Sequence, residues 1–320
     1  MVDNENAWIE KYRVYKLDEI LYQDTTLFKS IVKNKNMPNI LLWGSCGIGK
    51  TSAIVSLCLE LYGAKRYSEN VLEINASMDT GINVIRKIII TFTKTKMNRP
   101  HNNYPSFKTI ICDEADRMTS DSMSALRKVM EESLNTRFVF ICNDVSRIIE
   151  PIQSRCIKIK FREILPNIIF NKLKQISIDE KLHIDDDSLL LLSNLSNGDF
   201  RKSILFLQNL KFIDTVITKN DIYNICKYIT FEEFSNIVNN LHNIDDVINS
   251  IHFVLGNGYT INSILEQSMI FIINYNTDDY NKSTLLFDFG IIEKNIYDSC
   301  NEFLQLLKIF NDLLNFIHNC

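Results

Sequence analysis

Short apolar runs alternate with longer segments of helical spacing over the first half of the chain. Apolar or alternating runs predict five strands, at 39–43, 71–75, 109–112, 137–142 and 156–161. The spacing of apolar positions between these runs predicts helices, at 50–63, 81–96 and about 120–132. A chain that alternates in this way folds as a parallel sheet with helices on both faces. We therefore expect an α/β domain over residues 1–161.

The strand pattern stops after Phe161, and only helical patterns follow it. Three consecutive helices are predicted, at 165–182, 185–198 and 199–211. Aspartates should cap the second of these helices, and Gly198 should end it. We expect a small helical domain over residues 162–227 and an all-helical domain over residues 228–320.

The net charge of −4 is unevenly distributed along the chain. Residues 228–320 contain 3 Lys and Arg against 12 Asp and Glu, a balance of −9. Subtracting these from the totals of 35 and 39 leaves 32 against 27 for residues 1–227, a balance of +5. Any basic surface that suits nucleic acid therefore belongs to the first two domains.

Cysteine and histidine positions argue against a metal centre. The eight cysteines form no Cys-x-x-Cys pair, and most lie inside apolar runs, as reduced and buried thiols of an intracellular protein do. The five histidines have no ligand spacing. No apolar run has membrane-spanning length, and the polar N-terminus is unlike a signal peptide. We expect no metal beyond one that a nucleotide brings.

One glycine-rich segment, GSCGIGKT at 44–51, lies between the first strand and the following helix. It fits the pattern G-x-x-x-x-G-K-[ST], in which backbone N–H groups at a helix N-terminus cradle phosphates. Lys50 would reach the β- and γ-phosphate oxygens, and the Thr51 hydroxyl would bind Mg²⁺. A chance match is a poor alternative, because the strand–loop–helix context is also present. The predicted ATP contacts of this segment are Gly44, Ser45, Cys46, Gly47, Ile48, Gly49, Lys50, Thr51 and Ser52.

Two acidic residues, Asp113 and Glu114, follow the apolar strand at 109–112. Downstream of a phosphate loop, Asp113 would hold the Mg²⁺ ion, and Glu114 would orient and deprotonate the attacking water. The alternative is a helix N-terminus enriched in acids, which is the weaker explanation in this context. The pair therefore predicts ATP hydrolysis and not binding alone.

Two further polar residues are candidates for sensing the nucleotide. Asn143 ends the strand at 137–142, and its amide would face the γ-phosphate if that strand lies between the first and third strands. Arg201 lies near the start of the helix at 199–211, from which it would reach over the nucleotide. A turn asparagine and an ordinary exposed helix arginine remain open alternatives for these two residues.

Together these motifs resemble a small subunit of the replication factor C clamp loader, in the AAA+ ATPase superfamily. The similarity spans about residues 7–211 and follows the family's order through WIEKYRVYKLDEI (8–20), LEINASMDTGINVIR (72–86), CDEADRMTSDSMSALRKVME (112–131), NTRFVFICNDVSRIIEPIQSRC (135–156) and LSNGDFRKSILFLQ (195–208). Residues 228–320 resemble the family's helical collar in position and composition only. The resemblance implies an AAA+ P-loop sheet domain, a helical lid and an all-helical collar used for oligomerisation.

The resemblance also implies roles for single residues at the nucleotide. Asn143 would be the sensor beside the catalytic site, and Arg201 would be the sensor of the lid. Ile9 and Arg13 would contact the nucleotide from the segment at 8–20, which we call the N-terminal arm.

Arg155 follows a short helix that we expect Pro151 to end, and it directly precedes the last strand. In the family, the arginine of this Ser-Arg-Cys motif is a finger that reaches into the ATP of the neighbouring subunit. There it stabilises charge that develops on the γ-phosphate. The alternative for Arg155 is a salt bridge at the strand end. The role of Arg155 as an arginine finger implies that the protein works as an oligomer.

The resemblance further implies contact with the phosphate backbone of primer-template DNA, a readout of shape and charge. Arg86 matches the arginine of the family's DNA-facing helix, and Asn83, Lys87 and Lys94 lie on or near the same face. A solvated basic face explains the lysines equally well.

The chain departs from the family's usual residues at several positions, with Val14 for proline, Ser45-Cys46 for Pro-Pro, Ile48 for threonine, Met78 for aspartate and Thr80 for arginine. Because the phosphate loop works through backbone amides, we expect ATP binding to survive these changes. We also hypothesise that Cys46 is oxidisable.

The function favoured by the sequence is that of an ATPase subunit active at subunit interfaces. It would use ATP and Mg²⁺ within a five-subunit ring of large and small subunits to load a PCNA-type sliding clamp onto primer-template DNA. A DNA-remodelling AAA+ motor of the branch-migration type is an alternative that the acidic tail disfavours. A mainly structural subunit that donates its arginine finger is a second alternative, disfavoured by the full set of ATP motifs. We expect no membrane partner and a nuclear location, with an archaeal or viral origin left open.

Overall fold

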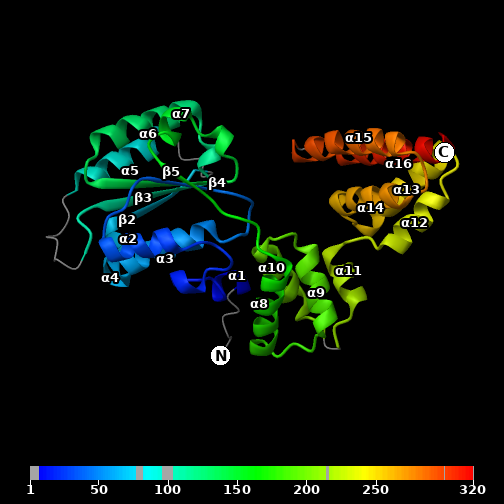
Figure 1. The fold of residues 1–320 in the computed structure, drawn as a ribbon, viewed down its shortest axis with the longest axis horizontal. Coiled ribbons are helices and arrows are strands. Elements are labelled where there is room, and N and C mark those ends of the chain that lie inside the picture. The colour runs from blue at the N-terminus through cyan, green and yellow to red at the C-terminus, as the bar shows by residue number, and fades with distance from the viewer. Residues whose placement is uncertain (1–6, 77–81, 96–103, 214–215, 299, 320) are drawn as a thin grey trace. The chain divides into compact units, whose positions relative to one another are not determined.

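A five-stranded parallel sheet organises the first part of the chain, as the apolar runs predict (Figure 1). Its strands are β1 (Ile40–Trp43), β2 (Val71–Asn75), β3 (Lys108–Asp113), β4 (Thr136–Cys142) and β5 (Ile157–Lys160). They are ordered β2-β3-β4-β1-β5, and all four neighbouring pairs are parallel. The computed structural model describes residues 7–76, 82–95, 104–213, 216–298 and 300–319, with residues 82–86, 297 and 319 described by their backbone only.

The central strands are buried on both faces, which explains their continuous apolar character. Ile40, Leu41 and Leu42 of β1 are fully buried, and so are Phe138 and Val139 of β4. Burying each such side chain contributes about 1.5–3 kcal/mol of transfer free energy. The strands therefore fix their carboxyl ends rigidly at one edge of the sheet, where the predicted catalytic residues follow them.

Helices cover both faces of the sheet (Figure 1). One face is covered by α2 (Thr26–Asn34), α3 (Lys50–Tyr62) and α4 (Ala64–Asn70), and the other by α5 (Ile82–Lys94), α6 (Ser120–Glu132) and α7 (Glu150–Gln153). Met123 and Leu126 of α6 share one hydrophobic cluster with Ile110 and Phe140 of the sheet. The predicted bounds of α6 are confirmed, and the Thr119 side chain caps its first turn.

Short helices precede or connect these elements. They are α1 (Trp8–Lys11) and the 3-10 helices η1 (Leu17–Glu19), η2 (Ala115–Arg117) and η3 (Val145–Arg147). The expectation that Pro151 ends a short helix is wrong, because α7 spans Glu150–Gln153 and Pro151 lies in its first turn. Proline is tolerated there because the first N–H groups of a helix have no partner inside the helix.

The three helices predicted after Phe161 are present as α8 (Pro166–Asp179), α9 (Asp186–Leu195) and α10 (Phe200–Leu210), which we call the lid. Asp185 Oδ1 accepts a hydrogen bond of 3.0 Å from the Ser188 N–H and caps α9 as predicted. Asn197 and Gly198, with φ values of 49° and 80°, reverse the chain after it.

The chain forms two compact units, Met1–Phe212 and Ile213–Cys320. The second unit is all helical, as predicted, with α11 (Lys219–Cys226), α12 (Phe231–Asn239), α13 (Ile244–Asn257), α14 (Ile261–Asn274), α15 (Asp279–Tyr297) and α16 (Glu302–Asn319). Its own core includes Phe234, Phe289 and Phe310, all fully buried. The division into 1–161, 162–227 and 228–320 stays a prediction.

Seven cysteines lie in the described ranges, and Cys46, Cys58, Cys112, Cys142, Cys156 and Cys300 are free thiols. Four of them, Cys58, Cys112, Cys142 and Cys226, are buried, while Cys46 and Cys300 are exposed. Within the same ranges, no helix has the length and apolar character needed to cross a membrane.

Candidate nucleotide site

The phosphate loop joins β1 to α3 and packs tightly against the rest of its unit. Gly44 and Gly47 have φ values of 145° and 66°, which residues with a Cβ rarely adopt. A Cβ on Gly44 would lie 2.6 Å from the Phe161 carbonyl oxygen, and one on Gly47 would lie 1.7 Å from Asp199 Oδ1. The glycines therefore allow the loop to run directly into the N-terminus of α3, where backbone N–H groups suit an anion.

Lys50 is the buried cation of this loop. Its Nζ donates hydrogen bonds to the carbonyl oxygens of Gly44 (2.7 Å) and Ser45 (2.6 Å) and to Asn143 Oδ1 (2.8 Å). The side chain is 8% exposed, and this burial lowers the pKa of Lys50, although the Asp113 carboxylate opposes the shift. A buried ammonium whose hydrogen-bond acceptors are all neutral is well suited to bind an anion.

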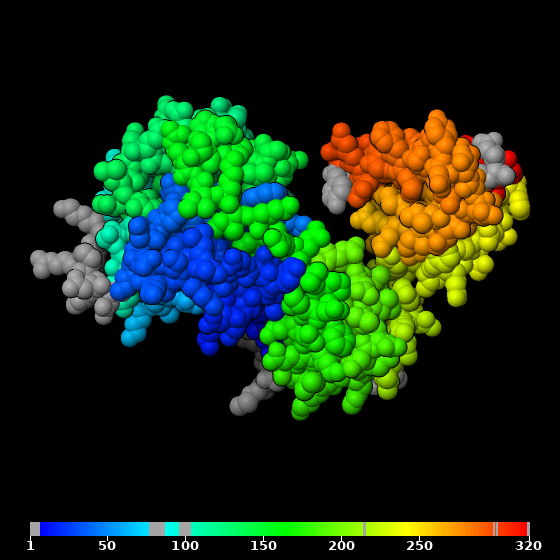
Figure 2. Space-filling view, in the orientation of Figure 1, coloured from blue at the N-terminus to red at the C-terminus, as the bar shows by residue number. Residues whose placement is uncertain are grey.

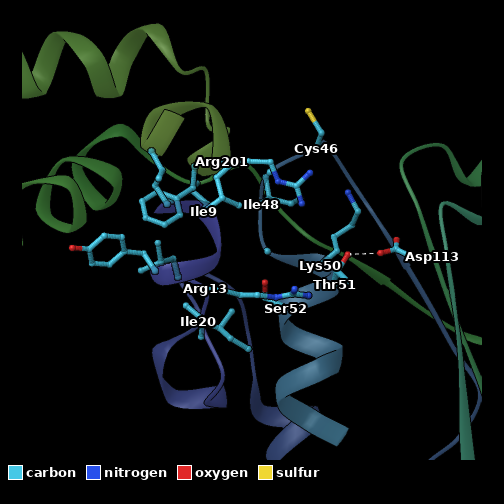
Figure 3. Close-up of a pocket in the computed structure, with 18 of the residues that line it drawn as sticks. Ile9, Arg13, Ile20, Cys46, Ile48, Lys50, Thr51, Ser52, Asp113 and Arg201 are labelled. Carbon is cyan, nitrogen blue, oxygen red and sulfur yellow. Dashed lines mark hydrogen bonds between the residues drawn. The ribbon is translucent and has the colours of Figure 1, made fainter. Parts of the chain in front are cut away.

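The two predicted magnesium ligands are in contact at the end of β3. Thr51 Oγ1 donates a hydrogen bond of 2.9 Å to Asp113 Oδ2 (Figure 3). A hydroxyl and a carboxylate are hard oxygen donors that fit Mg²⁺, which takes its other ligands from water and phosphates. Among the residues that the structure describes, no group of three or more His, Cys, Asp or Glu could hold a metal ion.

Glu114 adopts a strained backbone conformation directly after Asp113. Its φ and ψ are 53° and 39°, in the left-handed region that glutamate rarely adopts. The Glu114 N–H donates a hydrogen bond of 2.9 Å to Asp113 Oδ1, and Arg117 Nε lies 3.0 Å from Glu114 Oε2. Such strain is often found at functional sites, and here it turns the Glu114 side chain to line the same pocket as Lys50.

Asn143 lies beside Lys50, at the end of a strand in the centre of the sheet. The strand that it follows, β4, lies between β1 and β3, and the Asn143 amide reaches Lys50. The N–H groups of Asn143 and Asp144 both donate to Asp116 Oδ2, at 3.1 and 3.3 Å. Sequence reasoning missed Asp116 as the support of this turn, although it is the last acid of the run Asp113-Glu114-Ala115-Asp116.

These groups line a pocket of about 540 Å³ within residues 1–212, a volume typical of ligand sites. The pocket brings together the predicted residues Ile9, Arg13, Cys46, Gly47, Ile48, Gly49, Lys50, Thr51, Ser52, Asp113, Glu114, Asn143 and Arg201. Figure 3 shows Arg13 and Arg201 extending from the N-terminal arm and the lid toward the loop. Gly44 and Ser45 are not part of the lining, and their carbonyl oxygens hold Lys50 instead.

The lining also contains apolar residues that sequence reasoning missed. They are Val14, Ile20, Leu21, Ile164, Phe200 and Ile204. An apolar wall suits the flat face of a nucleobase, as in most small-molecule sites. Their only signal in the sequence is that all of them except Ile164 lie in or beside the N-terminal arm or the motif at 195–208.

The two loop residues that replace Pro-Pro make contacts that prolines could not make. Ser45 Oγ donates to Glu163 Oε1 at 3.0 Å, and Cys46 Sγ lies 3.2 Å from Asp199 Oδ2. Burial and the Asp199 carboxylate raise the pKa of the Cys46 thiol. A raised pKa reduces the thiolate population, which works against the hypothesised oxidation of Cys46.

Arg155 does not line the pocket of its own chain. Its Nη2 lies 2.7 Å from Glu131 Oε1 of α6, and its Nη1 donates 2.7 Å to the Pro151 carbonyl oxygen. The side chain remains 42% exposed. The guanidinium is therefore held in one orientation at the surface.

The predicted DNA contacts lie on or near α5. Lys87 and Lys94 are exposed, whereas the side chains of Asn83 and Arg86 lie outside the described residues. Met78 and Thr80 also lie outside them. These assignments stay predictions.

Comparison with protein families matches two parts of the chain. Residues 40–163 match the ATPase family associated with various cellular activities, and residues 221–310 match the replication factor C C-terminal domain. Replication factor C subunit 4 of Arabidopsis thaliana is 33% identical over 97% of this chain and 95% of its own length. The replication factor C small subunit of Picrophilus torridus is 41% identical over 73% of this chain and 72% of its own length.

Solved structures agree on the fold. Thermotoga maritima RuvB, a Holliday junction branch migration motor, superimposes with a TM-score of 0.55 at 14% identity, over 80% of this chain and 91% of that chain. That likeness shows the fold alone, whereas the full-length sequence relatives show the family. The chain belongs to the replication factor C small-subunit family and is an AAA+ ATPase.

Proposed function

We propose that this chain is a small subunit of a five-subunit clamp loader. In this role it would open a PCNA-type sliding clamp and load it onto primer-template DNA, with ATP hydrolysed where two subunits meet. The observation that carries the proposal is the contrast between a complete set of ATP groups in one pocket and an exposed Arg155 outside that pocket.

Each group in the pocket has a role that its position supports. Lys50 would bind the β- and γ-phosphates, and Thr51 and Asp113 would hold Mg²⁺. Glu114 would deprotonate the attacking water, with Asn143 helping to place it. The bound ion would supply charge neutralisation for the phosphates. Ile9, Arg13 and Arg201 would hold the nucleotide from the N-terminal arm and the lid.

Arg155 would act on the ATP of the neighbouring subunit. Glu131 and the Pro151 carbonyl hold its guanidinium in place before any partner binds. A charged group that is oriented in advance stabilises transition-state charge without a reorganisation cost at the moment of reaction. An oriented arginine that its own pocket does not use therefore favours an active site completed between subunits.

The rest of the chain would support assembly and DNA binding. We propose an ATP-binding domain at 1–161, a lid domain at 162–227 and a collar at 228–320, which the C-terminal family match at 221–310 supports. The balance of +5 in residues 1–227 suits DNA phosphates. Arg86, Asn83 and Lys87 are the proposed contacts with DNA.

The plant and human relatives favour a nuclear location, and the archaeal and viral relatives make another compartment the alternative.

ATP turnover by the full-length chain, alone and with the subunits that copurify with it, tests this proposal. We expect turnover in the assembly to rise with primed DNA and clamp. Arg155→Ala should lower hydrolysis at the neighbour's site by about 10³-fold, without weakening the chain's own ATP binding. Arg66→Ala is the matched control, because it removes a guanidinium from α4 beside β2, at the sheet edge opposite β5.

Two results would contradict the proposal. If the isolated chain hydrolyses ATP as fast as the assembly and Arg155→Ala changes neither, a solitary AAA+ motor becomes the better function. If the assembly loads clamps while Glu114→Gln in this chain has no effect, the chain is a structural subunit.

A further inference from the structure

The first half of the N-terminal arm is attached to the lid and not to the sheet. Trp8 of α1 is 4% exposed, and its backbone N–H donates a hydrogen bond of 3.0 Å to Gln208 Oε1 of α10. Lys211 Nζ lies 5.6 Å from the centre of the Trp8 ring. In Figure 2 the surface of the arm runs without a gap into the surface of the lid helices.

Glu180 is the centre of this attachment. It is the C-cap residue directly after α8, and its side chain is only 7% exposed. Its Oε1 accepts hydrogen bonds from Lys11 Nζ and from Tyr12 Oη, the latter at 2.7 Å, while Lys211 Nζ lies 3.8 Å from Oε2. Burial alone would raise the pKa of Glu180, but the hydrogen bonds from Lys11 and Tyr12 outweigh burial and lower it. Glu180 is therefore a carboxylate at neutral pH.

The second half of the arm is attached to α3, the helix that begins at the phosphate loop. The Val14 carbonyl oxygen accepts a hydrogen bond of 3.3 Å from Ser56 Oγ, and the Leu17 N–H donates a hydrogen bond of 2.9 Å to Glu60 Oε1. Arg13 thus lies between an attachment to the lid and an attachment to α3.

Ile9 and Arg13 both line the nucleotide pocket, whereas Glu180 does not. We propose that Glu180 is a positioning residue for the nucleotide. By fixing Lys11 and Tyr12 to the lid, it places the Arg13 guanidinium at the phosphate loop, so that Arg13 contacts ATP only with the lid in place. This inference rests on the proposed contact of Arg13 with ATP.

The physical basis is the cost of ordering a short segment. Without Glu180, residues 8–13 would keep Trp8 as an anchor but lose two hydrogen bonds to a charged acceptor, each of which contributes more than a neutral one. The arm would then sample positions in which Arg13 is displaced, and ATP binding would have to order it again.

A double-mutant cycle on ATP affinity tests the inference. Equilibrium binding of a fluorescent ATP analogue would be measured on the full-length chain for wild type, Glu180→Gln, Arg13→Ala and the double variant. We expect Glu180→Gln to weaken affinity by about fivefold in the wild-type background and by less than about twofold in the Arg13→Ala background, because residues that act together are not additive. Equal losses in both backgrounds, or no loss from Glu180→Gln, would overturn the inference.

A failure of the proposed site has a different signature. If Arg13→Ala leaves ATP affinity unchanged while Lys50→Ala abolishes binding, then Arg13 is not a nucleotide contact, and the inference falls with it. If Lys50→Ala also has no effect, the proposed pocket itself is wrong.

Two further variants separate positioning from stability. Asp186→Asn breaks the 2.6 Å ion pair with Lys174 between α8 and α9 of the same lid, away from the arm, and should leave affinity unchanged. Tyr12→Phe removes one hydrogen bond to Glu180 at constant ring volume. It replaces Glu180→Gln in the cycle if Glu180→Gln fails to fold.

In the absence of nucleotide, hydrogen exchange of the amides at 8–13 should quicken in Glu180→Gln and not in Asp186→Asn. Unchanged exchange would also overturn the inference.

Discussion

Two walls of the nucleotide pocket are built in different ways. The phosphate wall consists of Lys50, Thr51, Asp113, Glu114 and Asn143, which lie at or beside the carboxyl ends of β1, β3 and β4. The lid wall consists of Ile9, Arg13 and Arg201, which come from the N-terminal arm and from α10. The strands of the sheet determine where the residues of the phosphate wall lie. The lid wall depends on contacts such as Trp8 with Gln208, 200 residues apart in the sequence.

This difference separates two tasks. Buried, closely packed strands fix the positions of the groups in the phosphate wall. Fixed positions suit catalysis, which is slowed when a reacting group shifts by about 1 Å. The N-terminal arm is held to the lid by the buried Trp8 side chain and by polar side-chain contacts, each polar contact contributing on the order of 1 kcal/mol. We therefore expect changes in the phosphate wall to affect rate or binding strongly, and changes in the lid wall to affect affinity moderately.

The largest effect is expected from Glu114→Gln in the phosphate wall. It should lower the rate of ATP hydrolysis in the assembly by about 10²–10⁴-fold, because the amide cannot accept the proton of the attacking water. ATP affinity should change by less than about twofold, since glutamine keeps the shape of the side chain. Single-turnover hydrolysis and equilibrium binding measure the two quantities separately.

Glu132→Gln is the control, since Glu132 is an exposed residue of the last turn of α6 and should leave both quantities unchanged. If Glu114→Gln weakened binding as much as it slowed hydrolysis, Glu114 would hold the nucleotide and the division between the walls would be wrong.

The sequence predicts the phosphate wall because its signals are local. The glycine pattern at 44–51, the acids after an apolar strand and the asparagine at the end of the next strand each lie within a few residues of the element that positions them. Parallel pairing then brings their strand ends together without further information. The predicted strands and α6 are confirmed for the same reason.

The supports of the lid wall could not be predicted, because no local pattern encodes them. Glu180 looks like an ordinary acid at a helix end, and only the fold brings Tyr12 to it from 168 positions away. Asp116 likewise has no signal in the sequence that separates it from the neighbouring acids, although its carboxylate holds the Asn143 turn. Family resemblance supplied Ile9, Arg13 and the role of Arg201 as the lid sensor, and it contained no information on what holds these residues.

A direct comparison of the two walls pairs Lys50→Ala with Arg201→Ala. Lys50→Ala should weaken ATP affinity by about 100-fold, because it removes a buried, charge-assisted contact to phosphate. Arg201→Ala should weaken it by about three- to tenfold, since the lid can still close through its other contacts. Equilibrium binding of ATP measures both changes.

Lys202→Ala controls for the loss of a positive charge beside Arg201, because the Lys202 ammonium lies over the Phe206 ring and not in the pocket. Equal losses from Lys50→Ala and Arg201→Ala would show that the lid wall binds phosphate as strongly as the loop does.

The smallest effect concerns the pH dependence of stability and involves Glu180. Its folded-state pKa lies below the ordinary value of 4.5, so the unfolded chain binds more protons near that pH than the folded chain does. The carboxylate therefore stabilises the fold above about pH 4.5, and this contribution disappears as the pH falls through the lower, folded-state pKa.

Glu180→Gln should lower the melting temperature by about 2 °C at neutral pH, the size expected for a mostly polar contact. The difference in melting temperature between wild type and Glu180→Gln should disappear below pH 4.5. Thermal unfolding of both chains from pH 7 to pH 3.5 measures it, with Asp186→Asn as the control for the loss of a lid carboxylate. A difference that stays constant over this range would show that Glu180 holds the arm through its shape and not its charge, and the lid wall would then resemble the phosphate wall more closely than its polar contacts suggest.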